Sequence, residues 1–286
     1  MGEIAWLNGR WMKPSQAKVS AEDRGFLFGD GVYEAMMTYG GRLWALERHL
    51  RRLDRSLREM QIEGVDTAEV GRLSAQAMKR GGNVETLVYV QITRGAGPRS
   101  HDWKPGMKPT VFLTARPAPV YPPEYWTAGV SVSVQADVRW GRCDIKSVNL
   151  LGNVLALHAA HATGAFEAVL VRDGVVTEGT HSGIFIVRKG VAITREEGPH
   201  ILPSVTQGLV LEVAADMGVP TERRPFSLEE MLSAEETFDV GTTPGVLPIT
   251  RIDGKPVGDG KPGAVTLRLH EGYRNRVARE DDAPRD

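Results

Sequence analysis

The sequence contains a single cysteine, no long apolar run and almost no net charge. Because Cys143 is the only cysteine, an internal disulfide is excluded, which fits a reducing cytoplasm. No apolar run approaches the roughly 20 residues that a membrane helix needs, and the first residues lack the basic and apolar regions of a signal peptide. A net charge of −1 gives no basic face for nucleic acid or an anionic membrane. We therefore expect a cytoplasmic protein with neither of these partners.

The composition and the prolines predict two domains. The 286 residues are 41% apolar and 25% charged, which is typical of a globular protein that can bury one large core or two ordinary ones. Four prolines fall within residues 116–126, where they stiffen the chain and prevent strand pairing. We therefore predict an N-terminal domain over residues 1–117, a proline-rich linker over 118–126 and a C-terminal domain over 127–286.

The first half has the pattern of an α/β domain. Asn8-Gly9 is the residue pair that best suits a type I′ hairpin turn. Leucines and a methionine at steps of four and three draw one apolar stripe along a helix from about residue 46 to 60. A second helix is expected over about residues 67–80. Strands are expected over residues 31–38, 42–45, 85–94 and 109–115.

The second half is predicted to be mostly β, a barrel-like unit with helices outside, because strand patterns outnumber helix patterns. One helix is expected to run from Ser147, as its N-cap, to Thr163, and others to begin near Ser204 and Ser227. The last eight residues are mostly charged and are expected to be disordered. Hairpin turns are predicted at Asp173-Gly174, Lys189-Gly190 and Asp253-Gly254.

Lys146 differs from the other lysines in its setting. Six of the nine lysines stand directly before proline or glycine, and the remaining two besides Lys146 lie among polar residues or at a polar helix end. Lys146 lies between apolar segments, within residues 142–152. A buried lysine amine loses proton affinity and becomes a nucleophile toward carbonyls. From its position alone, a lysine that packs its stem on the core and extends its amine into water fits equally well.

A carboxylate follows about thirty residues later, where Glu178 is expected to end a strand within residues 176–185. An acid in this place can hold a protonated ring nitrogen. A nucleophilic lysine and such an acid are what pyridoxal phosphate chemistry needs, because the amine forms an imine with the cofactor and the acid keeps its pyridine ring an electron sink. Cys143 is close to Lys146, but a small core residue is its expected role.

Four separated passages strengthen this interpretation: residues 22–34, 94–101, 139–146 and 176–179. Together, and in this order, they resemble the fold-type-IV pyridoxal phosphate transaminases, and within them the D-amino-acid transaminase branch. The likeness runs from about Trp6 to Val277. It implies an α+β fold of two domains, a small N-terminal α/β domain and a C-terminal pseudo-barrel β domain with flanking helices, with the cofactor in the cleft between them. It also implies a homodimer whose active sites take residues from both subunits.

The resemblance assigns roles to individual residues. Lys146 matches the lysine that binds the cofactor and moves the proton, through aldimine and ketimine intermediates, and Glu178 matches the carboxylate on the pyridine nitrogen. Arg52 matches a phosphate ligand, although a solvated helix arginine is the simpler interpretation. No metal is implied. The remaining phosphate ligands implied are Val205 and Thr206, which open a helix whose free amides favour an anion, and Thr242 and Thr243, whose alternative role is turn capping.

A second set of residues matches the family's ligands of the substrate α-carboxylate. These are Tyr33, Arg99 and His101, and the resemblance implies that the last two come from the neighbouring subunit. Arginine suits a carboxylate because its planar fork donates two parallel hydrogen bonds. Taken alone, Arg99 and His101 would be surface residues of a polar loop. Glu34 should point away from Tyr33 if their strand is regular.

Two departures from the family pattern concern the pocket. His181 stands in residues 180–183, where relatives of this branch have serines and then asparagine, and Pro244-Gly245 also departs in a loop expected to line the substrate pocket. The alternatives on the same fold are a branched-chain L-amino-acid transaminase, an (R)-selective amine transaminase and aminodeoxychorismate lyase. A non-catalytic cofactor-binding relative is a further alternative, and the retained Lys146, Glu178 and Arg52 argue against it.

Overall fold

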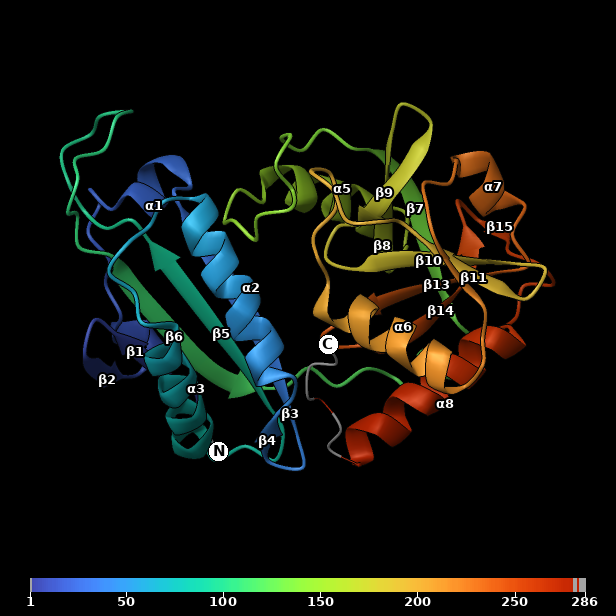
Figure 1. The fold of residues 1–286 in the computed structure, drawn as a ribbon, viewed down its shortest axis with the longest axis horizontal. Helices are drawn as coiled ribbons and strands as arrows, with labels where there is room; N and C mark the ends of the chain where they lie inside the picture. The colour runs from blue at the N-terminus through green and yellow to red at the C-terminus, as the bar shows by residue number, and fades with distance from the viewer. Residues whose placement is uncertain (1, 280–281, 283–286) are drawn as a thin grey trace. The chain divides into compact units, whose positions relative to one another are not determined.

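The computed structural model describes residues 2–279 and 282, and it divides the chain into two compact units (Figure 1). The first unit contains the described residues up to Pro119, together with Ile145–Asn149 and Asp282. The second unit contains Val120–Asp144 and the described residues from Leu150 onward. The boundary between Pro119 and Val120 lies within the predicted linker.

The first unit is built on a six-stranded antiparallel sheet with the order β2-β1-β6-β5-β3-β4. Helices α2 (Leu46–Glu59) and α3 (Thr67–Gly81) lie beside each other on one face of this sheet (Figure 1). The strands are β1 (Ile4–Leu7), β2 (Arg10–Met12), β3 (Gly31–Tyr39), β4 (Arg42–Leu43), β5 (Thr86–Thr93) and β6 (Thr110–Pro117). The unit also contains a short 3-10 helix, η1 (Pro14–Gln16), and a short α-helix, α1 (Arg24–Phe28).

The apolar stripe that predicted α2 is the face that packs on the sheet. Leu53 and Leu57 are buried, and Leu46 and Leu50 pack against the same core, which contains β-branched residues of the strands. The first hairpin turn is also confirmed, because Asn8 and Gly9 both have positive φ, as a type I′ turn requires.

The second unit contains a nine-stranded mixed sheet with the order β12-β11-β10-β13-β14-β7-β8-β9, and β15 pairs with β14. Three neighbouring pairs are parallel: β7 with β14, β7 with β8, and β11 with β12. The strands are β7 (Val130–Ala136), β8 (Glu167–Arg172), β9 (Val175–Gly179), β10 (Gly183–Arg188), β11 (Val191–Thr194), β12 (Thr221–Arg223), β13 (Glu236–Gly241), β14 (Gly245–Ile252) and β15 (Lys255–Pro256). The helices are α4 (Glu124–Thr127), α5 (Leu151–Ala162), α6 (Val205–Asp216), α7 (Leu228–Leu232) and α8 (Ala264–Ala278).

Local signals in this unit have their predicted outcomes. Ser204 caps α6, and Ser227 caps α7 in a capping box with Glu230. The three predicted hairpin turns join β8 to β9, β10 to β11 and β14 to β15. In each turn a positive φ at the first residue is followed by a glycine with positive φ.

The predicted helix start at Ser147 is wrong, because α5 begins at Leu151. Residues before it run alongside β3 instead: Tyr33 N donates to Lys146 O at 2.9 Å, and Val148 N donates to Gly31 O at 3.0 Å. Ser147 therefore takes part in a strand-like pairing and does not cap a helix. For the same reason Lys146, expected in the C-terminal domain, packs with the first unit.

The expected disorder of the last eight residues mostly concerns positions outside the described part of the chain. Of the two that are described, Arg279 is the C-cap of α8, and Asp282 forms hydrogen bonds with Arg42 and Ala45. Its carboxylate accepts hydrogen bonds from Arg42 at 2.8 Å and from Ala45 N at 2.7 Å. Across residues 2–279 and 282, no helix combines the length and apolar character needed to cross a membrane.

Candidate active site

Lys146 lies on the short segment that pairs with β3. Its backbone N–H donates to Ser56 Oγ at 3.3 Å, and its amine nitrogen is 4.3 Å from the centre of the Tyr33 ring. The residue is partly buried. The backbone pairing fixes the position of this lysine, and its amine lies over the Tyr33 ring.

Tyr33 and Glu34 make different contacts, as alternation along β3 predicts. Tyr33 contacts Lys146 and packs against Tyr89, with ring centres 5.7 Å apart. Burial, together with the neighbouring Tyr33, raises the pKa of Tyr89 to about 12. Glu34 is fully buried and contacts α2. The two neighbouring residues therefore serve separate contacts, one with the lysine and one with a helix arginine.

Arg52 is held by Glu34 through two parallel hydrogen bonds, from Nε at 2.7 Å and from Nη2 at 2.8 Å. His49 Nδ1 lies 2.7 Å from the same carboxylate. Burial would raise the pKa of Glu34, but the charge and hydrogen bonds of Arg52, and then those of His49, hold it well below its ordinary value. Glu34 is therefore an anion that fixes the guanidinium predicted to bind phosphate. The sequence analysis missed His49, although its spacing of three from Arg52 puts both on one helix face.

Arg99 and His101 lie together in the loop between β5 and β6. Both are exposed, and both contact Phe28: the guanidinium carbon of Arg99 is 5.3 Å from the ring centre, and the His101 ring centre is 5.7 Å away. Arg24 donates to the backbone carbonyls of Ser100 at 2.6 Å and His101 at 3.1 Å. The two predicted substrate residues are thus neighbours on an anchored loop.

The anchor of this loop is a buried cluster that the sequence analysis did not identify. Asp30 accepts hydrogen bonds from Arg24 at 2.7 Å and from Arg94 at 2.8 and 3.0 Å. Burial would raise the pKa of Asp30, but hydrogen bonds from Arg94 and Arg24 lower it. All three residues lie in or beside the passages that carried the resemblance, which was the available signal.

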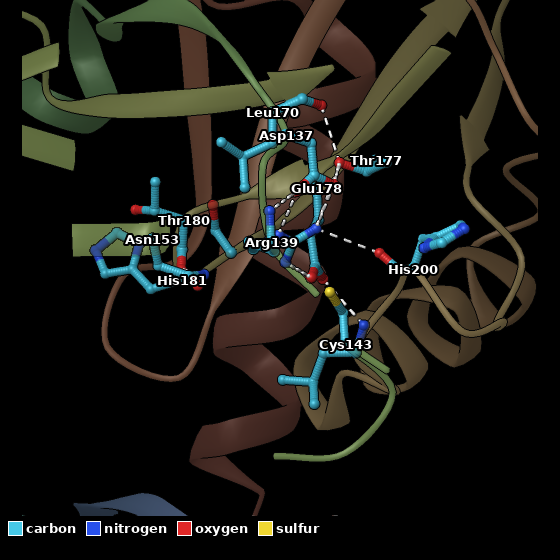
Figure 2. A network of polar contacts seen from close by, with 12 residues as sticks. Asp137, Arg139, Cys143, Asn153, Leu170, Thr177, Glu178, Thr180, His181 and His200 are labelled. Carbon is cyan, nitrogen blue, oxygen red and sulfur yellow. Dashed lines mark hydrogen bonds and ion pairs between the residues drawn. The ribbon is translucent and has the colours of Figure 1, made fainter. Parts of the chain in front are cut away.

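Glu178 is held by a second network, in the second unit (Figure 2). It lies near the end of β9, where Oε1 accepts from Arg139 and Oε2 accepts from Leu202 N at 3.1 Å. Arg139 also donates to both oxygens of Asp137, each at 2.9 Å. Although burial acts in the opposite direction, the hydrogen bonds and charges of Asp137 and Glu178 raise the pKa of Arg139 further. This arginine is therefore permanently charged and fixes the orientation of Glu178.

Cys143 is buried beside this network and has the expected role of a core residue. Its thiol donates to Trp140 O at 3.2 Å. Burial raises the pKa of the Cys143 thiol to about 11, although the charge of Arg139 acts in the opposite direction. A thiol with this pKa is protonated at neutral pH and is not a nucleophile.

The remaining predicted phosphate ligands lie at two places in the second unit. Val205 and Thr206 form the first turn of α6, where Ser204 Oγ accepts from Gln207 N at 3.2 Å and the other early N–H groups have no partner within the helix. Thr242 and Thr243 lie in the turn between β13 and β14, where the Thr243 hydroxyl lies 3.0 Å from the Tyr121 hydroxyl. A helix N-terminus and a pair of turn hydroxyls are suited to an anion.

The predicted site residues thus fall into two groups, one in each unit. Lys146, Tyr33 and Arg52 are connected through β3 and α2, and Arg99 with His101 form a separate pair in the same unit. Glu178 and the four phosphate residues belong to the second unit. Within the described ranges, no cluster of three histidines, cysteines or acids could hold a metal ion. The joint role of these residues remains a prediction.

Comparison with known proteins identifies the family. The sequence model described as amino-transferase class IV matches residues 31–252. D-alanine aminotransferase of Bacillus licheniformis is 38% identical over 276 residues, which cover 96% of this chain and 97% of that protein.

Solved structures agree on the fold. The branched-chain amino acid aminotransferase of Escherichia coli aligns with a TM-score of 0.91 at 22% identity, covering 96% of this chain and 94% of that one. The branched-chain aminotransferase of Thermoproteus uzoniensis, solved with norvaline, aligns with a TM-score of 0.86 at 26% identity over 97% and 95% of the two chains. The predicted fold and enzyme class are therefore confirmed: this chain belongs to the class IV aminotransferases.

Proposed function

We propose that this chain is a pyridoxal-phosphate-dependent transaminase that moves the amino group of a D-amino acid, of the D-alanine or D-glutamate type, to an α-keto acid. The observation that carries the substrate class is the exposed pair of Arg99 and His101 on Phe28, which together can bind a carboxylate. An amine substrate without a carboxylate would have no use for this pair. The 38% identity with a D-alanine aminotransferase supports the same substrate class.

The residues described above fit the cofactor. Pyridoxal phosphate supplies an aldehyde that condenses with amines and a pyridine ring that withdraws electrons from the substrate Cα. A lysine amine, a carboxylate fixed by an arginine and a helix N-terminus with hydroxyl side chains are the groups that such a molecule needs. In this proposal Lys146 would hold the cofactor through its amine and would carry the proton removed from the substrate Cα, and Glu178 would hold the ring nitrogen in its protonated form. The residues that would bind the phosphate are Arg52, Val205, Thr206, Thr242 and Thr243.

The proposal includes a homodimer in which Arg99 and His101 act in the neighbouring subunit's site. One face of α5 supports such an association, because Leu151, Val154 and Leu155 are 71%, 58% and 57% exposed. Their spacing of three and four places them on one side of the helix. An exposed apolar strip of this kind is typical of a protein interface. The cytoplasmic location and the identity of the keto-acid acceptor remain predictions.

The test of the function compares two amino donors. D-Alanine should convert the visible absorbance of the bound cofactor to that of its aminated form, and L-leucine should do so much more slowly. In this family the substrate proton always leaves on the same face of the cofactor. The side on which Arg99 and His101 hold the carboxylate therefore decides which enantiomer reacts. Single-turnover spectra with each donor give both rates. A faster reaction with L-leucine would replace this proposal with a branched-chain transaminase.

Replacing the proposed carboxylate ligand should affect only substrates that carry a carboxylate. Arg99→Met should lower kcat/KM for D-alanine by roughly 10- to 100-fold, because a charge-assisted hydrogen bond of about 1.5–3 kcal/mol is lost. An (R)-amine without a carboxylate should react at an unchanged rate. Lys104→Met, which removes a cation from the same loop, is the matched control and should leave both substrates unaffected. Equal losses for both substrates in Arg99→Met would contradict the assignment.

A further inference from the structure

The turn that follows Glu178 is organised around one buried acid, Glu167 of β8. Glu167 is fully buried, and its Oε1 accepts hydrogen bonds from Thr180 N at 3.2 Å and from the Thr180 hydroxyl. Its Oε2 accepts from His181 N at 3.4 Å and from Ser182 Oγ at 3.2 Å. A single carboxylate therefore binds each of the three residues that connect β9 to β10.

His181 can supply the counter-charge for this acid. Its Nδ1 forms an ion pair with Glu167, while about half of the imidazole, 53%, is exposed to solvent. The turn is also held from α5, where Asn153 Nδ2 donates to Thr180 O at 2.7 Å; Figure 2 shows Asn153, Thr180 and His181 beside one another. The residue that departs from the family pattern is thus bound to the carboxylate that organises the turn.

A second buried acid, Asp239 of β13, interacts electrostatically with Glu167 and His181. It is fully buried, and neither of its carboxylate oxygens has a hydrogen-bond partner among the described residues. Burial, and then the charge of Glu167, raise the pKa of Asp239 to about 8, while His181 acts in the opposite direction. Asp239 lies opposite Ile184 of β10, the strand that begins directly after the turn.

Within the part of the chain that the structure describes, no other charged group acts appreciably on Asp239. The causes of its shifted pKa are burial, Glu167 and His181. The helices that pack on β13 are α6 and α8. The buried Arg276 of α8 pairs with Glu212 of α6 at 2.6 Å, and His270 of α8 lies 3.1 Å from Val246 O. If Asp239 ionised, two buried anions, Asp239 and Glu167, would share the single imidazole of His181. Burying the second anion would cost considerable free energy.

We propose that Glu167, His181 and Asp239 are positioning residues for the turn 179–182, and that the turn keeps its shape only while Asp239 carries a proton. This inference rests on the proposed cofactor role of Glu178, the residue directly before the turn. When Asp239 ionises, its negative charge repels the Glu167 carboxylate. The hydrogen bonds that Glu167 accepts from Thr180, His181 and Ser182 are then weakened. The strand end that presents Glu178 then loses its support, and cofactor affinity falls.

The proton on Asp239 should be visible in cofactor binding. The experiment measures the pyridoxal phosphate dissociation constant of the parent and of Asp239→Asn from pH 6.5 to 9, with the full-length apoenzymes. Groups on the cofactor titrate alike in both proteins, so the ratio of the two constants isolates Asp239. We expect a ratio that is constant below pH 7 and rises toward about tenfold at pH 9, the limit for one linked proton over one pH unit. Asp173→Asn, the same change in an exposed turn, should reproduce the parent.

Thermal unfolding of the apoenzymes tests the proton without the cofactor. Asp239 binds its proton up to about pH 8 when folded, but only up to about pH 3.9 when unfolded. Between these values the unfolded parent binds fewer protons, so its stability falls as pH rises, and this contribution is absent from Asp239→Asn. The Tm difference in favour of the variant should therefore grow up to about pH 8 and then stay constant. Asp239→Leu, which fills the site without a polar group, should show the same trend.

The pairing of His181 with Glu167 is tested by a double substitution. His181→Gln leaves Glu167 buried without its counter-charge and should weaken cofactor binding by about tenfold or more. Adding Glu167→Gln should restore most of that loss, because the buried charge is removed together with its partner. Additive losses, or a flat ratio for Asp239→Asn in a protein that binds the cofactor, would overturn the inference and leave the proposed function intact. A parent that binds no pyridoxal phosphate would overturn the proposed function as well.

Discussion

Lys146→Ala should abolish transamination while still binding pyridoxal phosphate loosely. We expect turnover with D-alanine to fall at least about 10³-fold, because the residue supplies both the covalent attachment and the group that moves the proton. Binding should persist because the proposed phosphate ligands Arg52, Val205 and Thr206 are unchanged. The fold should also persist, since Lys146 contributes to the pairing with β3 through its backbone carbonyl, which alanine retains. Steady-state turnover and equilibrium dialysis of the cofactor give the two measurements.

The matched control for this variant is Lys79→Ala, which removes an exposed lysine from α3. Alanine is the residue that favours a helix most, so the control should be at least as stable as the parent. It should have parent activity and bind the cofactor covalently. If Lys146→Ala retained turnover within about tenfold of the control, a different residue would have to be the proton carrier.

Glu178→Gln should leave the protein folded but slow the half-reaction with D-alanine by roughly 10²- to 10³-fold. The glutamine oxygen can still accept the hydrogen bond from Leu202 N, and Arg139 keeps its two hydrogen bonds to Asp137. What the amide lacks is the negative charge that holds a proton on the pyridine nitrogen, so charge that develops at the substrate Cα is less stabilised. The rate constant for cofactor conversion in a stopped-flow spectrometer measures this step directly.

The matched control removes one negative charge at an exposed site, so it separates the effect at Glu178 from the loss of any single acidic group. Glu222→Gln alters an exposed acid of β12 that pairs with Arg224, and surface pairs of this kind contribute little. Its half-reaction should therefore match that of the parent. An unchanged rate in Glu178→Gln would mean that another group holds the ring nitrogen.

Features that depend on neighbouring residues could be predicted from the sequence. The apolar stripe of α2, the Asn8-Gly9 turn and the caps at Ser204 and Ser227 all follow from chemistry within a few positions, and the structure has each of them. The start of α5 could not be predicted in this way. Ser147 has the composition of an N-cap, but pairing with β3, more than a hundred residues earlier, determines its conformation.

The candidate site shows the same division. Lys146 and Glu178 could be singled out because each has an unusual local setting, and the resemblance supplied the roles of the others. The residues that orient them were missed: Glu34 fixes Arg52, and Asp137 with Arg139 fixes Glu178. Such buried pairs join positions far apart in the chain, so no local pattern reports them. Only the folded structure shows which charge meets which.

The packing of Ile145–Asn149 with the first unit has a consequence for how the chain is made. During synthesis the N-terminal half leaves the ribosome first, and domains usually fold as they emerge. Here β3 gains two of its backbone hydrogen-bond partners, Lys146 O and Val148 N, only after the interdomain stretch and β7 have been translated. A fragment that stops at Pro119 would leave Tyr33 N and Gly31 O without these partners. If the two halves were co-expressed as separate polypeptides, the second would have to supply the segment Ile145–Asn149 to pair with β3 of the first. Activity would then depend on fragment complementation.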